Sequence, residues 1–141
     1  MDNVLGSLYI GNIDDAHTPP PVISALLWTA LESKLIPPPA ILLGRIPLRE
    51  YTEAVPMDIA FSIEWLTRHL PDHQILVACR AGMGRSVSVV IAYLCCVQGM
   101  TYEEAVAFIS PRRKGSTPLP RLEETIEKVK QQRQATKKSG S

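Results

Sequence analysis

The chain has 141 residues, enough for one domain with an ordinary hydrophobic core. Its formal net charge is only +1, which argues against bulk binding to nucleic acid or to a membrane surface. The three cysteines include an adjacent pair, so they form a poor disulfide framework and predict free thiols in the cytoplasm. We predict a single domain over residues 1–130 and a polar tail without regular structure over residues 131–141. No signal peptide is expected, and the longest apolar run, residues 87–97, is too short to span a bilayer.

The first half of the chain alternates short apolar runs with proline-rich breaks. The apolar runs predict three strands, at residues 4–10, 22–28 and 40–43. Proline triplets at residues 19–21 and 37–39 favour an extended path and interrupt regular structure. Residues 29–36 fit either a helical turn or a loop. Residues 46–48 are expected on a loop that approaches the functional site.

The second half of the chain predicts one buried strand and four helices. The short β-branched run at residues 74–78 indicates the strand, and the longer apolar run at residues 87–97 indicates a buried helix. Asp58 is expected to cap the first helix, and Thr101 with Glu104 forms a capping box for the third. The four helices are expected to start near residues 58, 87, 102 and 122. This alternation predicts an α/β fold, in which a short and mostly parallel central sheet has helices on both faces.

The segment between that strand and the buried helix, residues 79–86, has the sequence CRAGMGRS. A glycine-containing turn at a helix N-terminus gathers unpaired N–H groups at the positive end of the helix dipole, so it can bind an anion. Cys79 in this environment is favoured as the thiolate, and the planar guanidinium of Arg85 suits phosphate oxygens. The Ser86 hydroxyl could bond to the sulfur or could serve only as a helix N-terminal serine. The candidate phosphate-binding residues are Arg80, Ala81, Gly82, Met83, Gly84 and Arg85.

The Cys-x5-Arg spacing of this segment resembles the signature loop of the cysteine-dependent protein phosphatases, in their small dual-specificity branch. LYIGN at residues 8–12 and the prolines and arginines from Pro111 onward are similar to other parts of that branch, so the resemblance covers roughly residues 8–126. It implies a protein tyrosine phosphatase-like sandwich that hydrolyses phosphate monoesters through a cysteinyl-phosphate intermediate. No metal or cofactor is expected, because none of the three histidines has metal-ligand spacing with cysteine or carboxylates. One position departs from the family, which usually has histidine where this chain has Ala78.

The resemblance also implies a general acid on a loop some thirty residues before the cysteine, usually an aspartate. No aspartate occurs between Asp15 and Asp58 in this chain. Glu50 falls at the corresponding place, so we predict that it is the acid. Glu53 is the second choice and Asp58 the third. A solvated loop carboxylate is the alternative interpretation of Glu50.

The expected substrates are phosphotyrosine and phosphoserine or phosphothreonine on proteins, or a small aryl phosphate. Neither nucleic acid nor a membrane is expected as a partner, and the oligomeric state stays open. The alternatives are a phosphatase of a lipid or glycan phosphate, a non-catalytic phosphate-binding module, and a sulfur-transfer or arsenate-reducing enzyme. The basic run at residues 112–114 fits either a solvated loop or a rim that attracts phosphorylated substrates. Cys95 and Cys96 are expected in the core.

Overall fold

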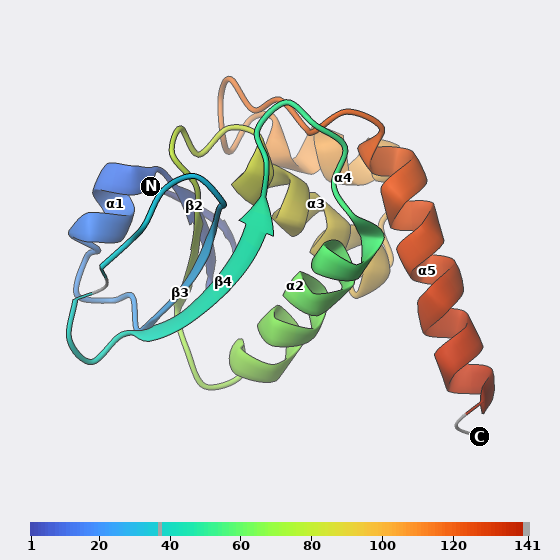
Figure 1. Ribbon diagram of the computed structural model, residues 1–141, viewed down its shortest axis with the longest axis horizontal. Helices are drawn as coiled ribbons and strands as arrows, with labels where there is room; N and C mark the ends of the chain where they lie inside the picture. The colour runs from blue at the N-terminus through green and yellow to red at the C-terminus, as the bar shows by residue number, and fades with distance from the viewer. Residues whose placement is uncertain (37, 140–141) are drawn as a thin grey trace.

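The computed structural model describes residues 1–36 and 38–139, so Pro37 of the second proline triplet and the last two residues of the predicted tail lie outside the described residues. Five strands form one sheet in the order β1-β2-β5-β3-β4, in which β1 is antiparallel to β2 and the other neighbours are parallel (Figure 1). The strands are β1 (Asp2–Leu5), β2 (Leu8–Gly11), β3 (Ala25–Ala30), β4 (Leu42–Leu48) and β5 (Ile75–Ala78).

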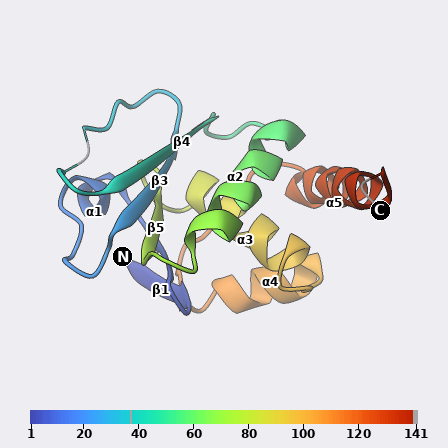
Figure 2. The same cartoon turned by 90° about the horizontal axis from the view of Figure 1, so that it is seen from below.

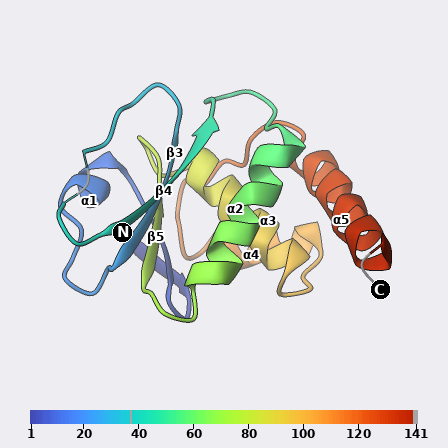
Figure 3. The ribbon, with the colours of Figure 1, turned by 60° about the horizontal axis from the view of Figure 1, so that its bottom comes forward.

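Helices cover both faces of this sheet, which confirms the predicted α/β class. In Figures 2 and 3, α1 lies on one face and the other four helices lie on the opposite face. All residues of the central strand β5 are fully buried, as expected for a parallel strand covered on both sides. The helices are α1 (Ile13–His17), α2 (Pro56–His69), α3 (Arg85–Cys96), α4 (Tyr102–Ile109) and α5 (Leu122–Ser139).

Two predictions for the first half, one of a strand and one of a loop, are wrong. The single strand expected over residues 4–10 is a hairpin, because Gly6 has a φ of +54° and reverses the chain between β1 and β2. Residues 46–48, expected on a loop, belong to β4, where Ile46 and Leu48 point into the core. Pro47 is tolerated there because β4 is an edge strand and needs no N–H on its outer side.

The predicted helix caps and helix ends are confirmed only in part. The capping box at the start of α4 is present, because Thr101 Oγ1 accepts from the Glu104 N–H and the Glu104 carboxylate accepts from the Thr101 N–H. Asp58 does not cap α2: the N-cap is Val55, and Asp58 lies in the first turn. Helix α5 continues to Ser139, although the sequence predicted no regular structure from residue 131. Within the described ranges, none of the helices combines the length and the apolar character needed to cross a bilayer.

Candidate active site

The segment with the sequence CRAGMGRS lies at the carboxyl edge of the parallel strands. Strand β5 ends at Ala78, residues 79–84 turn back, and α3 begins at Arg85. The turn therefore sits at the N-terminal, positive end of a twelve-residue buried helix (Figure 1). Open α/β sheets commonly bind ligands at this edge. We call residues 79–85 the phosphate loop.

The Cys79 thiol is held at the start of the phosphate loop. Its residue is only 2% exposed, and the Gly82 N–H donates to Sγ at 3.2 Å. Ser86 Oγ lies 3.3 Å from the same sulfur, within hydrogen-bond distance. This contact agrees with the first of the two roles considered for Ser86 in the sequence, a bond to the sulfur. Gly82 has a φ of +72°, a conformation that a side chain would strain. The backbone thus turns one N–H group directly toward the sulfur.

Ala78 precedes the cysteine and is completely buried at the end of β5. Its carbonyl accepts a hydrogen bond of 3.0 Å from the Thr29 hydroxyl on β3. The methyl side chain offers no group that could hydrogen-bond to the phosphate loop. The neighbouring strand therefore fixes the main chain at the point where the loop begins, even though the histidine usual in the family is absent.

Arg85 is the most completely buried charge of the site, with 1% of its surface exposed. Its Nη1 donates to both carboxylate oxygens of Glu32, with 2.9 Å to Oε2, and to the Leu48 carbonyl at 3.3 Å. Its Nη2 is buried and makes no hydrogen bond to any residue that the structure describes. A buried donor without an acceptor costs about 1–3 kcal/mol, so a native site that keeps one has a use for it.

Glu32 is a site residue that the sequence analysis missed. It lies just after β3, in the segment left open between a helical turn and a loop. The hydrogen bond from Arg85 is the main cause that lowers the pKa of the Glu32 carboxyl below its ordinary value. A carboxylate directly after a buried strand, at the same sheet edge as the phosphate loop, was the available signal. Only the strand order shows that this edge is shared.

The phosphate loop forms the floor of a pocket of about 410 Å³. Glu50 lines this pocket, and its Oε2 lies 3.9 Å from Arg85 Nη2, whereas neither Glu53 nor Asp58 is among the described residues that line it. Tyr51 follows with 83% of its surface exposed and a φ of +62°, a strained conformation of the kind that clusters at functional sites. The lining residues are Glu50, Tyr51, Cys79, Ala81, Met83, Gly84, Arg85, Thr117, Pro118, Leu119 and Pro120.

Cys95 and Cys96 lie at the opposite end of α3 from the phosphate loop. Cys95 is buried in the larger core cluster, and that burial raises the pKa of its thiol to about 11. Cys96 packs against the same cluster. Cys95 is therefore a core residue, as the sequence predicted, whereas Cys96 is only partly buried at the edge of that core.

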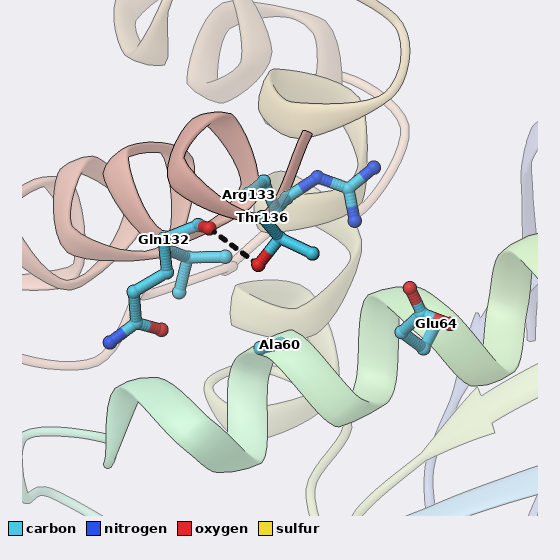
Figure 4. A pocket seen from close by; sticks show the side chains of 6 residues that line it. Ala60, Glu64, Gln132, Arg133 and Thr136 are labelled. Atoms are coloured by element: carbon cyan, nitrogen blue, oxygen red, sulfur yellow. Dashed lines mark hydrogen bonds between the residues drawn. The ribbon is translucent and has the colours of Figure 1, made fainter. Parts of the chain in front are cut away.

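A second hollow, of about 330 Å³, lies between α2 and α5 (Figure 4). Its polar groups include Glu64, Gln132 and Arg133, and the Thr136 hydroxyl donates to the Gln132 carbonyl within α5. Among the described residues that line it there is no cysteine, serine or histidine. Cys79 and Arg85 line the pocket at the phosphate loop instead.

The sequence model of the dual specificity phosphatase catalytic domain matches residues 46–132. The match covers more than half of the chain, so the chain belongs to the dual specificity phosphatase family. Mouse dual specificity protein phosphatase 8 is 34% identical over 76 residues, which are 52% of this chain and 12% of that protein, and its human counterpart is 33% identical over the same shares. The match therefore spans only about an eighth of the length of these curated relatives.

Solved structures with low sequence identity share the fold. Human DUSP28 superposes with a TM-score of 0.79 at 19% identity, over 96% of this chain and 99% of that one. The human tyrosine phosphatase-like serine/threonine/tyrosine-interacting protein superposes with a TM-score of 0.82 at 20% identity, over 95% of this chain and 97% of that one. These likenesses establish the phosphatase-like sandwich.

Proposed function

We propose that this protein hydrolyses phosphate monoesters through a cysteinyl-phosphate intermediate on Cys79. The observation that carries the proposal is the buried Nη2 of Arg85, which makes no hydrogen bond to any described residue, on a side chain that lines the same pocket as Cys79. A phosphoryl group bound between the two would give this donor an acceptor. Membership of the dual specificity phosphatase family supports the same conclusion.

The reaction has two steps. In the first, the Cys79 thiolate attacks phosphorus, the bond to the ester oxygen breaks, and Glu50 gives its proton to the departing oxygen. In the second, a water molecule attacks the phosphorus of the cysteinyl phosphate, Glu50 takes up a proton of that water, and the Cys79 sulfur leaves with inorganic phosphate released. The Ser86 hydroxyl, 3.3 Å from the sulfur, donates to it as the thiolate re-forms.

The phosphate loop stabilises the charge on the phosphoryl group in both steps. The three equatorial oxygens keep their negative charge throughout the transfer, so fixed donors around them lower both barriers. The N–H groups of residues 80–85, apart from the Gly82 N–H that is directed at the Cys79 sulfur, and the Arg85 guanidinium supply these donors. The electropositive field comes from the main chain and one side chain, so the chemistry requires no metal.

The substrates that we propose are phosphotyrosine and phosphoserine or phosphothreonine residues of proteins. The walls of the pocket are largely apolar, with Leu119, two prolines and the exposed Tyr51 ring, which suits an aryl phosphate. The three free cysteines support a reducing compartment, and we infer that the protein works in the cytoplasm. A lipid or glycan phosphate is the second candidate substrate, because the phosphate loop contacts only the phosphoryl group.

The test is phosphate release from matched phosphotyrosine and phosphothreonine peptides and from a phosphoinositide, with Cys79→Ser as the blank. Wild-type protein should release phosphate from the phosphotyrosine peptide, and Cys79→Ser should release none while still binding orthovanadate. Glu50→Gln should slow alkyl phosphates far more than aryl phosphates with good leaving groups, because only the former need a proton donor. Orthovanadate binding by the wild type without any phosphate release would make the protein a phosphate-binding module.

A further inference from the structure

The basic run at residues 112–114 has a role that the sequence did not predict. Arg113 is only 6% exposed, so it belongs neither to a solvated loop nor to a rim that meets the substrate. Its backbone N–H donates to the Ile109 carbonyl at the end of α4, and its side chain extends to the phosphate loop. It is not among the residues that line the catalytic pocket.

The guanidinium of Arg113 joins the phosphate loop to the first strand. Its Nε donates to the Gly82 carbonyl at 2.9 Å, and its Nη1 donates to Asp2 Oδ2 on β1 at 2.8 Å. The contact is tight, because a Cβ atom on Gly82 would lie 2.5 Å from Arg113 Nη2 and 2.5 Å from the Gly11 carbonyl oxygen. Only glycine at position 82 lets the arginine approach so closely.

This contact is one of three in which a described residue outside α3 holds a carbonyl group of the phosphate loop. The Arg80 carbonyl accepts from the Ile13 N–H at 3.1 Å, and the Met83 carbonyl accepts from the Thr117 N–H at 2.7 Å. In a trans peptide the C=O and the following N–H point in opposite directions. Each carbonyl held from behind therefore turns the next N–H toward the pocket, and the residues that carry those N–H groups, Ala81, Met83 and Gly84, all line it.

We propose that Arg113 is a positioning residue that fixes the peptide between Gly82 and Met83, and that Asp2 holds its guanidinium in place. By keeping the Gly82 carbonyl outward, Arg113 aims the Met83 N–H at the phosphoryl oxygens. Arg113 is the charged side chain among these three backbone-holding contacts, so its contribution can be removed by substitution. The kinetic consequence of this proposal rests on the proposed phosphatase function, whereas the consequence for oxyanion binding does not.

The experiment compares Arg113→Met, Arg113→Lys and Asp2→Asn with the wild type, and uses Arg112→Met as the matched control. Arg112 lies beside Arg113 but is exposed, with its guanidinium 3.6 Å from the centre of the Phe108 ring. Three measurements are made on each variant: the affinity for orthovanadate by calorimetry, kcat and KM with an aryl phosphate, and the Tm of thermal unfolding. Arg113→Met should weaken orthovanadate binding and lower kcat/KM by about 10- to 100-fold, less than the roughly 10²- to 10³-fold cost of losing an oxyanion donor outright. Arg112→Met should change neither by more than about twofold.

Asp2→Asn separates positioning from simple electrostatic attraction. If Arg113 acted only through its positive charge, removing the negative charge of Asp2 should tighten orthovanadate binding. The proposal requires the opposite, a loss of about two- to fivefold, because a neutral amide oxygen holds the guanidinium less firmly than the carboxylate that accepts from its Nη1. Arg113→Lys should recover part of the loss, since an ammonium group can reach one acceptor but cannot reproduce the fork.

Tighter orthovanadate binding by Asp2→Asn would overturn the proposal. So would a lower Tm of Arg113→Met with unchanged affinity and unchanged kinetic constants, because that result describes a structural role alone. If Arg113→Met does not fold, Arg113→Lys and Asp2→Asn decide the matter in the same assays. If the wild type releases no phosphate, the proposed function fails, and the orthovanadate measurements still test the positioning role.

Discussion

Replacing Arg85 with lysine tests the centre of the site. The Nη1 of Arg85 donates to Glu32 and to the Leu48 carbonyl, whereas Nη2 has no acceptor among the described residues and would bind the phosphoryl group in the proposed reaction. A lysine ammonium keeps the positive charge and can stay paired with Glu32, but it cannot offer a planar fork to two phosphate oxygens at the same time. The variant Arg85→Lys therefore removes the planar arrangement of the hydrogen-bond donors and keeps the positive charge.

The size of the effect follows from the bonds lost. A hydrogen bond to a charged group contributes about 1.5–3 kcal/mol. Arg85→Lys loses one or two of them, but the retained ammonium charge offsets part of the loss, so we expect a net loss of about 2–4 kcal/mol in the transition state. This corresponds to roughly a 30- to 900-fold lower kcat/KM. The assay is the initial rate with an aryl phosphate over a range of concentrations, together with the inhibition constant of orthovanadate. Because the phosphoryl oxygens are charged in the ground state as well, orthovanadate inhibition should weaken too.

The control for this experiment is Arg112→Lys, an arginine-to-lysine change on the exposed surface that should leave kcat/KM unchanged. Thermal unfolding of both variants shows whether the protein remains folded at the assay temperature. If folded Arg85→Lys keeps kcat/KM within threefold of the wild type, the guanidinium does not contact the reacting phosphoryl group, and the interpretation of its buried Nη2 is wrong.

Two further predictions follow from the titrating groups. The lowered pKa of Glu32 means that its pairing with Arg85 stabilises the fold at neutral pH and that this contribution is lost as the pH falls below about 4.5. The free energy of unfolding, measured in urea, should therefore be higher for the wild type than for Glu32→Gln, and the difference should be larger at neutral pH than in acid. A difference independent of pH would contradict the ion pair; Glu32 is partly exposed, so the effect should stay below about 1 kcal/mol. Cys95, with its pKa raised to about 11, should resist iodoacetamide at neutral pH, whereas Cys79 should react. Orthovanadate should protect Cys79 from this reaction. Peptide mass spectrometry measures the labelling of each cysteine, and equal labelling of the two would contradict the prediction.

Local sequence patterns predicted some elements well and others poorly. The capping box of α4 was visible because its two partners are three residues apart. The hairpin between β1 and β2 was missed, since a lone glycine between apolar residues does not distinguish a turn from a bulge. The C-terminal part of α5 was missed because the apolar periodicity of the sequence stops near Val129. The glutamine, lysine and arginine residues that follow have high intrinsic helix propensity and favour a helix even where no apolar periodicity is present.

The phosphate loop was readable from the sequence because its residues are contiguous between a strand and a helix. Glu50 could be nominated only through the resemblance, and its position on the pocket wall comes from the path of the chain after β4. Glu32 carried only the weak signal of a carboxylate after a buried strand, and no local pattern connects it to the phosphate loop. It lies 53 positions from Arg85, and the two meet because β3 is placed next to β5 in the sheet.

The amino-acid sequence by itself determined the α/β class, the family, and the strand, turn and helix that carry Cys79 and Arg85, because these depend on neighbouring residues and their periodicity. The tertiary structure alone decided which distant side chains surround the phosphate loop. Arg113 reaches Gly82 across 31 positions and Asp2 across 111. Such contacts depend on strand order and register, which bring together residues that share no local pattern in the chain.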